Sequence, residues 1–376
     1  MTYSFGNRRL LIWSSIPTHH QSAFLAALRE RDIDLVVHYY RHVDASRLNL
    51  GWASHKDLPQ GEHFVPESPS AVYQCRDWRE RIHIVPGYGC VFLMRLAWFL
   101  SRRSIPWLHW SEHSRPSRRS NVTFALKRIY GQLVHRHALG ALAIGELARR
   151  EFIRWGIPPG RIRFLPYAVE ALDHVPHEEH RPMVQGTRFL FLGTLYPTKG
   201  IDILLRAMHD VLAVHSQARL ELVGNDLSAG NYRRDAERLE IAHAVQFSGP
   251  VESRHVGSAL SRCDVLILPS RHDGWGVVLN EAASVGRAII ASDACGAAHH
   301  LVQPGKNGFR VPAADASALA EAMCAYCLDA GLSVRHGAES LRIFEDFTPA
   351  RNAERFVEAL DSLQAATVDA VRRRAT

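Results

Sequence analysis

The chain contains 376 residues, of which 47% are apolar and 22% are charged, and it carries a net charge of +7. This composition is that of a soluble globular protein and excludes an intrinsically disordered chain, and the length predicts two domains. The net positive charge favours anionic partners such as nucleotide phosphates, a phosphorylated lipid, a membrane surface or nucleic acid.

Six cysteines occur without the spacing of a disulfide framework. Cys324 and Cys327 form a C-x-x-C pair inside a helix-like pattern, and because there is no second pair, buried helix cysteines are favoured over a zinc or redox site. Free thiols are typical of a reducing cytoplasm, where we expect the protein. Residues 90–100 are the most apolar stretch, but they are shorter than the ~18 residues of a spanning helix and contain Arg95. They predict a core helix, and a membrane-facing helix is the alternative.

The first half of the chain alternates short apolar runs with helix-like patterns. The run after Arg8 and Arg9 is too short for a secretory signal and predicts a buried strand. Strands that alternate with helices form parallel sheets covered on both faces, so this half predicts a Rossmann-like domain. The expected strands are residues 9–14, 33–40, 82–87, 105–110, 139–144 and 162–166, with helices from about 20 to 31 and at 90–103.

A polar segment at 171–187 is typical of a linker and separates a first domain over 1–170 from a second over 188–349. The second half repeats the alternation, so the fold class is α/β with two Rossmann-like, doubly wound domains. The tail over 350–376 is helix-like, and we expect it to pack on the first domain. The strands of the second domain are expected near 188–192, 218–223, 245–248, 264–268, 288–291 and 309–311.

A glycine turn and a lysine follow the strand at 188–192. In the sequence FLFLGTLYPTKG, Gly193 follows the strand and Lys199 comes just before the next helix. A glycine lets the backbone turn sharply and approach a ligand. A helix N-terminus and an ammonium group together form a pyrophosphate site, because N–H donors, dipole and charge converge there. A solvated lysine in an ordinary loop is the alternative.

A second strand–loop–helix segment, PSRHDGWGVVLNEAAS, occupies residues 269–284. Asp273 would lie just outside the helix N-terminus, with Glu281 about two turns into the helix. Gly274 and Gly276 would let the main chain approach a phosphate or a sugar. Glu281 can accept hydrogen bonds from paired ribose hydroxyls, and Asp273 can orient sugar hydroxyls. The alternative is that Asp273 only caps the helix and Glu281 lies on the surface.

Together these segments resemble the donor half of the retaining glycosyltransferases of the GT4 family, which have the GT-B fold. The resemblance covers residues 188–312 closely and the first domain in outline. It is carried by GTLYPTKG at 193–200, PSRHDGWG at 269–276, EAASVG at 281–286, AIIASD at 288–293 and VQPGKNG at 302–308. Several motifs in one order make a chance match improbable.

The resemblance implies two domains that face a central cleft and a transferase that uses a UDP- or GDP-linked sugar as its donor. Lys199 would neutralise the diphosphate, Asp273 would hold the donor sugar and Glu281 would bind the ribose. The implied donor-binding residues are Gly193, Thr194, Lys199, Phe247, Arg271, Asp273, Gly274, Trp275, Gly276, Val277, Val278 and Glu281. The acceptor would be a glycan or a lipid-linked acceptor of surface polysaccharide synthesis.

Two positions depart from the family pattern. Thr194 stands where the family usually has an arginine, so one expected pyrophosphate cation is missing. Arg271 or another basic residue could compensate, and a different placement of the donor is the alternative. Asp273 replaces a glutamate, which shortens the reach of the carboxylate by one methylene. This change can alter the preference for the donor sugar.

The acceptor half is less specific. Glu112 and His113 follow the strand that ends near residue 110, where relatives place a catalytic-centre histidine or carboxylate, so we expect them to be catalytic together with Asp273 and Lys199. Local structural roles for Glu112 and His113 are the alternative. His19, His20 and Tyr88 follow other strand ends and are expected to contact the acceptor. Basic residues between 115 and 128, including Lys127, could attract a phospholipid-linked acceptor, with a solvated face as the alternative.

The sequence contains no constellation of metal ligands, and the resemblance implies neither metal nor cofactor, since GT-B enzymes use cationic side chains and helix termini instead. A GT-B epimerase or phosphorylase and a nonenzymatic carbohydrate-binding protein are the alternatives. A dinucleotide-binding oxidoreductase is disfavoured because no G-x-G-x-x-G follows the first strand. No nucleic-acid motif is present, so nucleic acid is not an expected partner. Peripheral contact with the cytoplasmic membrane face is expected, and the sequence does not indicate an oligomeric state.

Overall fold

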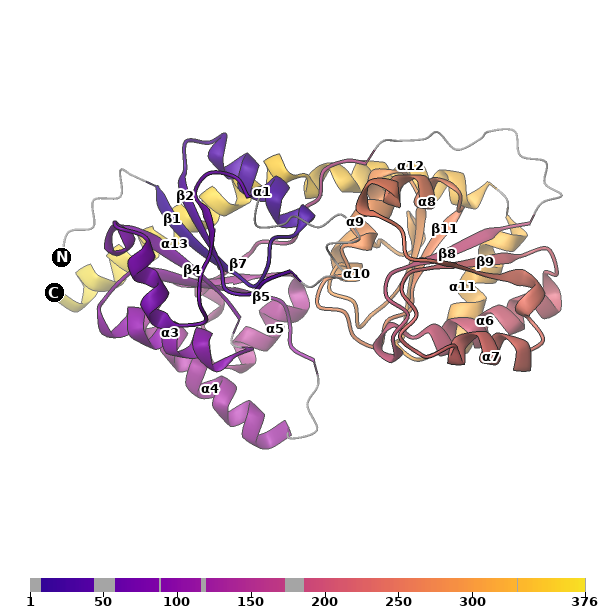
Figure 1. The fold of residues 1–376 in the computed structure, drawn as a ribbon, viewed down its shortest axis with the longest axis horizontal. Helices are drawn as coiled ribbons and strands as arrows, with labels where there is room; N and C mark the ends of the chain where they lie inside the picture. Colours follow the sequence, from indigo (N-terminus) through magenta and orange to yellow (C-terminus); the bar gives the residue numbers. More distant parts are fainter. Residues whose placement is uncertain are drawn as a thin grey trace. The chain divides into compact units, whose positions relative to one another are not determined.

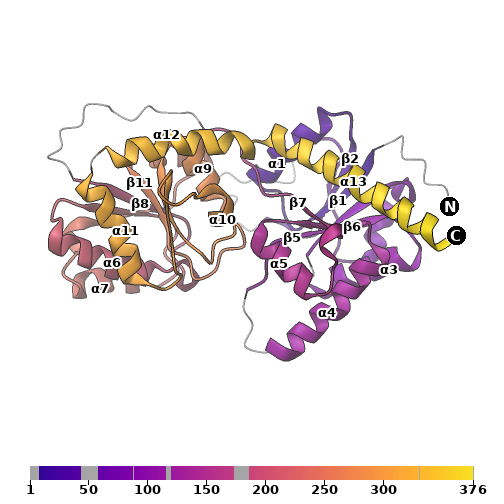
Figure 2. The same ribbon diagram turned by 180° about the vertical axis from the view of Figure 1, so that it is seen from behind.

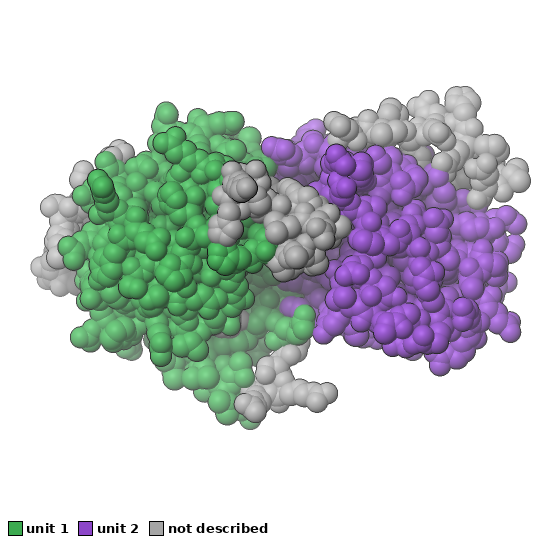
Figure 3. Space-filling model, in the orientation of Figure 1, with its two compact units in different colours: residues 1–168, 349–376 green, residues 169–348 purple. Residues whose placement is uncertain are grey.

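The computed structural model describes residues 8–43, 58–87, 89–115, 120–172, 186–329 and 331–375. The chain forms two compact units, residues 1–168 with 349–376 and residues 169–348 (Figure 3). Both units combine a parallel sheet with helices, which confirms the predicted α/β fold class. Most of the linker predicted at 171–187 lies outside the described residues. Among the described residues, we find no helix whose length and hydropathy would let it traverse a lipid bilayer.

The first unit contains a parallel sheet of seven strands in the order β3-β2-β1-β4-β5-β6-β7 (Figure 1). Its central strands are continuous apolar runs; Leu10, Leu11 and Ile12 are at most 2% exposed, as expected for strands covered on both faces. The short strand β3 was not predicted, because Glu62–Phe64 contains no apolar run. The strands are β1 Arg9–Ser14, β2 Asp34–Tyr39, β3 Glu62–Phe64, β4 Ile82–Pro86, β5 Trp107–Ser111, β6 Gly140–Ala143 and β7 Ile162–Phe164.

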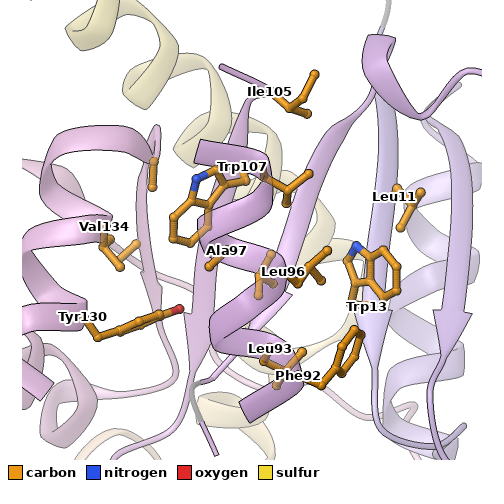
Figure 4. Close-up of a cluster of buried hydrophobic side chains, with 14 of the residues drawn as sticks. Leu11, Trp13, Phe92, Leu93, Leu96, Ala97, Ile105, Trp107, Tyr130 and Val134 are labelled. Carbon is orange, nitrogen blue, oxygen red and sulfur yellow. The ribbon is translucent and has the colours of Figure 1, made fainter. Parts of the chain in front are cut away.

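Helices cover both faces of this sheet. On one face, Trp13 and Trp107 join a buried cluster with apolar residues of α3, α4 and α5, among them Phe92 (Figure 4). On the other face, Phe24 of α1 packs against Trp110, with ring centroids 5.8 Å apart. The helices of this unit are α1 His19–Arg29, α3 Val91–Arg102, α4 Ser120–His137, α5 Glu146–Arg154 and α13 Pro349–Ala375.

The C-terminal helix α13 is part of the first unit, next to α1 (Figure 2). Arg31, just after α1, donates to Glu354 at 2.7 Å. The buried amide of Asn352 donates to the carbonyl of Pro166 at 2.8 Å. These contacts tie the end of the chain to segments that precede residue 169.

The second unit contains a parallel sheet of six strands in the order β10-β9-β8-β11-β12-β13. Its strands are β8 Arg188–Leu192, β9 Arg219–Val223, β10 Val245–Gly249, β11 Val265–Leu268, β12 Ala288–Ser292 and β13 Gly308–Val311. Its helices are α6 Ile201–Val214, α7 Asn231–Arg238, α8 Val256–Ser261, α9 Val278–Ser284, α10 Ala298–Leu301, α11 Ala316–Leu328 and α12 Leu332–Phe344. Cys324 and Cys327 lie on α11 as free, half-buried thiols.

The strand order determines where each sheet can bind a ligand. In the first unit β1 lies between β2 and β4, and in the second β8 lies between β9 and β11. Connections leave such a strand toward both sides of the sheet, which opens a crevice at the carboxyl ends of the strands. The loops after β1, β4, β8 and β11 are therefore the places to look for functional side chains.

Candidate active site

In the second unit, the loops after β8 and β11 bring Lys199 and Asp273 together. The ammonium group of Lys199 donates to Asp273 Oδ2 at 2.6 Å. The two side chains are 28% and 14% exposed, so solvent can still reach both. A charge-assisted hydrogen bond of this length is among the stronger polar contacts in proteins. Both predicted charged residues thus belong to one cluster at the point where the winding of the sheet reverses.

The backbone around Lys199 explains its position. Residues 197–199 form a single 3₁₀ turn, and Gly200 then adopts φ 71° before α6 begins. A Cβ atom at Gly200 would lie 2.2 Å from the carbonyl oxygen of Pro269, so only glycine allows the two loops to approach this closely. The N–H of Arg271 donates to the carbonyl of Thr198 at 2.8 Å, which joins the loops directly.

The guanidinium of Arg271 binds residues at and just before the start of α6. It donates to both carboxylate oxygens of Asp202, at 2.6 and 2.7 Å, and to the carbonyl of Pro197 at 2.9 Å. Asp202 also accepts from Arg206 at 2.9 Å. Arg271 therefore links the two loops, and its suggested role in place of the arginine missing at Thr194 stays a prediction. Thr194 itself is exposed.

The segment from Gly274 to Val278 is held by its own packing. The indole of Trp275 is 1% exposed, and its N–H donates to Asn280 at 2.8 Å. The side chain of Trp275 is therefore an anchor, and its carbonyl already accepts from the N–H of Ala297 at 2.7 Å, so its contact with the donor stays a prediction. Gly276 has φ 90°, and a Cβ there would lie 2.5 Å from the sulfur of Cys295. Val277 and Val278 begin α9, where the first N–H groups have no partner within the helix.

Glu281 lies in the first turn of α9, one turn nearer its start than predicted. Its carboxylate accepts no hydrogen bond from the residues that the structure describes. Burial raises the pKa of Glu281 to about 7, because the charged form is poorly solvated. A carboxylate that lacks partners in a poorly solvated place is able to accept hydrogen bonds from ligand hydroxyls.

Gly193, directly after β8, and Phe247, within β10, belong to the same sheet, in which β9 separates these two strands. Gly193 follows β8, and its N–H donates to the carbonyl of Val223 at 2.9 Å. Phe247 lies on the edge strand β10, where the guanidinium of Arg233 stands 4.4 Å from the centre of its ring. Arg233 also donates to the carbonyl of Phe247 at 3.3 Å. The guanidinium of Arg233 therefore lies over the ring of Phe247. The contact of Phe247 with a nucleotide base stays a prediction.

In the first unit, Tyr167 brings together two of the predicted residues. Its hydroxyl is hydrogen-bonded to Glu112, and burial, followed by the charge of Glu112, raises the pKa of Tyr167 well above its usual value. The ring of Tyr167 lies 4.9 Å from that of His20, centroid to centroid. Glu112 follows β5, His20 begins α1 after β1, and Tyr167 follows β7. The sequence analysis missed Tyr167, although a polar aromatic residue directly after a strand end could have indicated it.

The remaining residues of the acceptor half have different positions. His113 is half-buried, and the next residue, Ser114, donates its N–H to Glu151 at 2.7 Å. Lys127 donates to the same carboxylate at 2.8 Å and is only 13% exposed. The expectation that Lys127 belongs to a solvated basic face is therefore wrong, because Glu151 holds it in a half-buried ion pair. Tyr88 and the side chain of His19 lie outside the described residues.

The comparisons with known proteins find similarity in both sequence and fold. Residues 186–329 match the family model described as "Glycosyl transferases group 1". The chain is 30% identical over 227 residues to a phosphatidyl-myo-inositol mannosyltransferase of Mycobacterium leprae, which covers 56% of each protein. It is also 30% identical over 155 residues to the lipopolysaccharide core biosynthesis mannosyltransferase LpcC of Rhizobium leguminosarum, covering 40% of this chain and 43% of the relative.

Solved structures resemble the whole chain in fold. Anabaena Alr3699/HepE, solved in complex with UDP and glucose, superimposes with a TM-score of 0.72 at 18% identity, covering 95% of this chain and 100% of that one. The apo lipopolysaccharide outer core galactosyltransferase WaaB superimposes with a TM-score of 0.71 at 16% identity, covering 94% and 99%. The chain spans about half the length of the curated relatives that it matches. The two parallel-sheet units thus have a GT-B fold, and residues 186–329 in the second unit match the group 1 glycosyltransferases.

Proposed function

We propose that the protein is a retaining glycosyltransferase that moves a sugar from a UDP- or GDP-linked donor to a glycan or a lipid-linked acceptor in surface polysaccharide synthesis. The observation that carries the proposal is the pairing of Lys199 with Asp273 at 2.6 Å, at the carboxyl ends of β8 and β11. A cation at this position of a parallel sheet suits the diphosphate of a nucleotide sugar.

The chemistry requires stabilisation of the leaving group. As the bond between sugar and phosphate breaks, negative charge grows on the diphosphate and the sugar becomes oxocarbenium-like. Lys199 would hold that charge in a partly desolvated position, where such an interaction is worth more than in water. Asp273 would then exchange its bond to Lys199 for bonds to hydroxyls of the donor sugar. Glu281 would accept hydrogen bonds from the ribose.

The acceptor would bind at the carboxyl ends of the first sheet. Tyr167 holds Glu112 through its hydroxyl and lies against His20. These groups offer a carboxylate, a phenol and an imidazole to the hydroxyls of an incoming glycan. Retention of configuration through a front-face route, in which the departing phosphate takes the acceptor proton, would need no protein nucleophile and contrasts with the two opposed carboxylates of hydrolases.

We further propose that the reaction needs no metal ion and takes place on the cytoplasmic side of a membrane. The cation Lys199 supports the first part, because it supplies the positive charge that a divalent ion would otherwise provide. The free state of all six cysteines is consistent with a reducing compartment. Undiminished transfer in the presence of a chelator supports metal independence, and loss of activity that Mg²⁺ or Mn²⁺ restores refutes it.

A nucleotide screen tests the proposal directly. The purified chain is heated with UDP, GDP, ADP or CMP, since a ligand that binds only the folded state raises the melting temperature by mass action. The best nucleotide identifies the base, and its sugar derivatives are then tested for transfer and for slow hydrolysis. Stabilisation by UDP or GDP that disappears in Lys199→Ala and Glu281→Ala supports the site. Equal stabilisation in both variants refutes it.

A further inference from the structure

The positive charge of the chain is concentrated in one segment. Residues 91–140 contain nine Lys or Arg residues and a single acidic residue, Glu112, which gives a net charge of +8. The whole chain carries +7, so the remaining residues together carry −1. Helices α3 and α4 lie in this segment and contain no Asp or Glu. Glu151 neutralises Lys127, and the other cations of these two neighbouring helices give a positive field that attracts an extended anionic partner.

The same two helices expose large apolar side chains. Trp98 of α3 is 56% exposed, and Leu126 and Ile129 of α4 are 53% and 68% exposed. Val91 and Met94 precede Trp98 at helical spacing, and Val122 precedes Leu126, so each helix carries an exposed apolar stripe. We call the surface formed by Val91, Met94, Arg95, Trp98, Val122, Leu126, Ile129 and Arg136 the α3–α4 face.

Core packing does not account for these side chains. The buried side of α3 is formed by other residues, among them Phe92, Leu93 and Leu96, which pack on Trp13 and Trp107 of the sheet (Figure 4). Helix α3 is therefore apolar on two sides, of which only one is covered by the unit. A helix that is apolar nearly all round is normally buried or faces a membrane.

A groove of about 690 Å³ lies between the two helices, with basic and apolar residues side by side. Arg95 of α3 and Arg136 of α4 line it together with Trp98, Ile129 and Leu133. The guanidinium of Arg102 stands 5.4 Å from the centre of the Trp98 ring. Arg and Trp side chains with an apolar stem and a polar tip are suited to the boundary between lipid headgroups and acyl chains.

We propose that the α3–α4 face binds the surface of a bilayer that contains anionic phospholipid. The arginines contact headgroup phosphates, and the stripes of Trp98 and of Leu126 with Ile129 enter the boundary with the acyl chains. Binding of an anionic nucleic acid would explain the positive charge of this face. It would not explain the exposed aliphatic side chains on the two stripes. The purpose of the contact rests on the proposed function, because a lipid-linked acceptor is presented at such a surface.

Vesicle flotation of the full chain tests the proposal without any sugar donor. Vesicles of phosphatidylcholine alone are compared with vesicles in which about one third of the lipid is phosphatidylglycerol. We expect the chain to float with the anionic vesicles and to bind them at least about tenfold more tightly than the neutral ones. The binding is expected to weaken as the salt concentration rises from about 0.1 M to about 0.5 M, because salt screens the attraction between the arginines and the anionic headgroups.

Two pairs of substitutions separate the charge from the apolar contact. Arg95→Glu with Arg136→Glu is expected to lower the partition coefficient about a hundredfold. Each cation near an anionic leaflet raises this coefficient about fivefold, and the two new carboxylates also repel the anionic headgroups. Leu126→Ser with Ile129→Ser is expected to lower it about tenfold at unchanged charge. The matched control is Val214→Ser with Leu328→Ser, two apolar residues of the second unit that are 68% and 77% exposed. This control is expected to float like the wild type.

Four results would overturn the proposal. The first is a wild-type chain that fails to float with anionic vesicles. The second is a Leu126→Ser, Ile129→Ser variant that floats as well as the wild type. The third is a control variant that loses flotation as the face variants do. The fourth is tighter binding of single-stranded RNA that the face variants lose. Nucleotide binding and melting temperature verify the fold of each variant, so a failed transfer assay and a failed flotation assay remain distinguishable.

Discussion

Lys199 and Asp273 are 74 positions apart in the sequence, and in the structure the ammonium donates to the carboxylate at 2.6 Å. The pair joins the loop after β8 to the loop after β11, on either side of the point where the sheet reverses its winding. Asp273 balances the charge of Lys199 in the unliganded protein. A diphosphate that competes for the same ammonium would release Asp273, so donor binding and positioning of the sugar are expected to be coupled.

Lys199→Ala is expected to weaken binding of UDP or GDP about 10- to 100-fold and to lower kcat/KM about 10²- to 10³-fold, because the cation acts most strongly on the charge of the leaving group. Titration calorimetry and initial rates measure the two effects. Lys306→Ala is the control, since this exposed lysine lies after α10, away from the β8 and β11 loops. Equal losses in both variants would show that general charge, not the pair, is responsible.

Glu281→Gln is expected to stabilise the protein at high pH and to weaken nucleotide binding. Burial raises the pKa of Glu281 from 4.5 to about 7, so the folded state holds the proton more tightly than the unfolded one. The stability contributed by protonated Glu281 is complete below about pH 4.5 and is lost as the pH rises through 7. Glutamine avoids this loss because it stays neutral.

Melting curves check this prediction. The melting temperature of Glu281→Gln should exceed that of the wild type at pH 8 and match it near pH 4.5. Glu237→Gln, at an exposed position of α7, serves as the control and should show no such pH-dependent gain. A Glu281→Gln variant that is no more stable at pH 8, or that binds UDP and GDP like the wild type, contradicts the assignment.

Gly276→Ala is expected to be far more destabilising than Gly305→Ala. Both glycines have positive φ, 90° and 77°, so alanine costs about 1–2 kcal/mol of backbone strain at either position. At Gly276 the new Cβ would also lie 2.5 Å from Cys295 Sγ and 2.9 Å from Leu268 Cδ2, whereas nothing lies within 4 Å at Gly305. Overpacking adds about 1–3 kcal/mol. Urea unfolding measures the difference, and equal losses would show that packing around Gly276 is loose.

Tyr167→Phe keeps the ring beside His20 but removes the hydroxyl that is bonded to Glu112. We expect kcat to fall about tenfold, because Glu112 loses the group that positions it, while the Kd for UDP or GDP stays unchanged. The loss of one hydrogen bond lowers stability by about 1 kcal/mol. Tyr73→Phe, at an exposed tyrosine, is the control. A variant with wild-type turnover would assign Tyr167 a purely structural role.

Several site features follow from short-range pattern. The apolar runs that became β8 and β11, and the glycine and lysine that follow β8, can be recognised because strand periodicity and glycine turns are local properties of a sequence. The helix that contains Glu281 was predicted too, but its start was placed one turn too early, because the turn at Gly276 depends on Cys295 packing against it.

Other features could not be predicted, because they depend on partners from distant segments. Asp202 holds Arg271 and Glu151 holds Lys127, and in both pairs the carboxylate comes from a different element than the cation. Tyr167 meets Glu112 only because the segment after β7 passes the end of β5, where the carbonyl of Leu165 accepts from the indole of Trp110. Strand β3 pairs with β2 without an apolar run of its own.

The sequence alone thus determined the α/β class and the loops that carry the chemistry. Hydrophobic periodicity, the positions of glycines and the order of motifs are properties of short segments, so they can be recognised without the fold. Only the tertiary structure decided which carboxylate neutralises Lys199, which arginine is already bound, and which apolar side of α3 remains uncovered. Those outcomes depend on the order of strands in each sheet and on the packing of helices against it, and both arise from contacts between residues far apart in sequence.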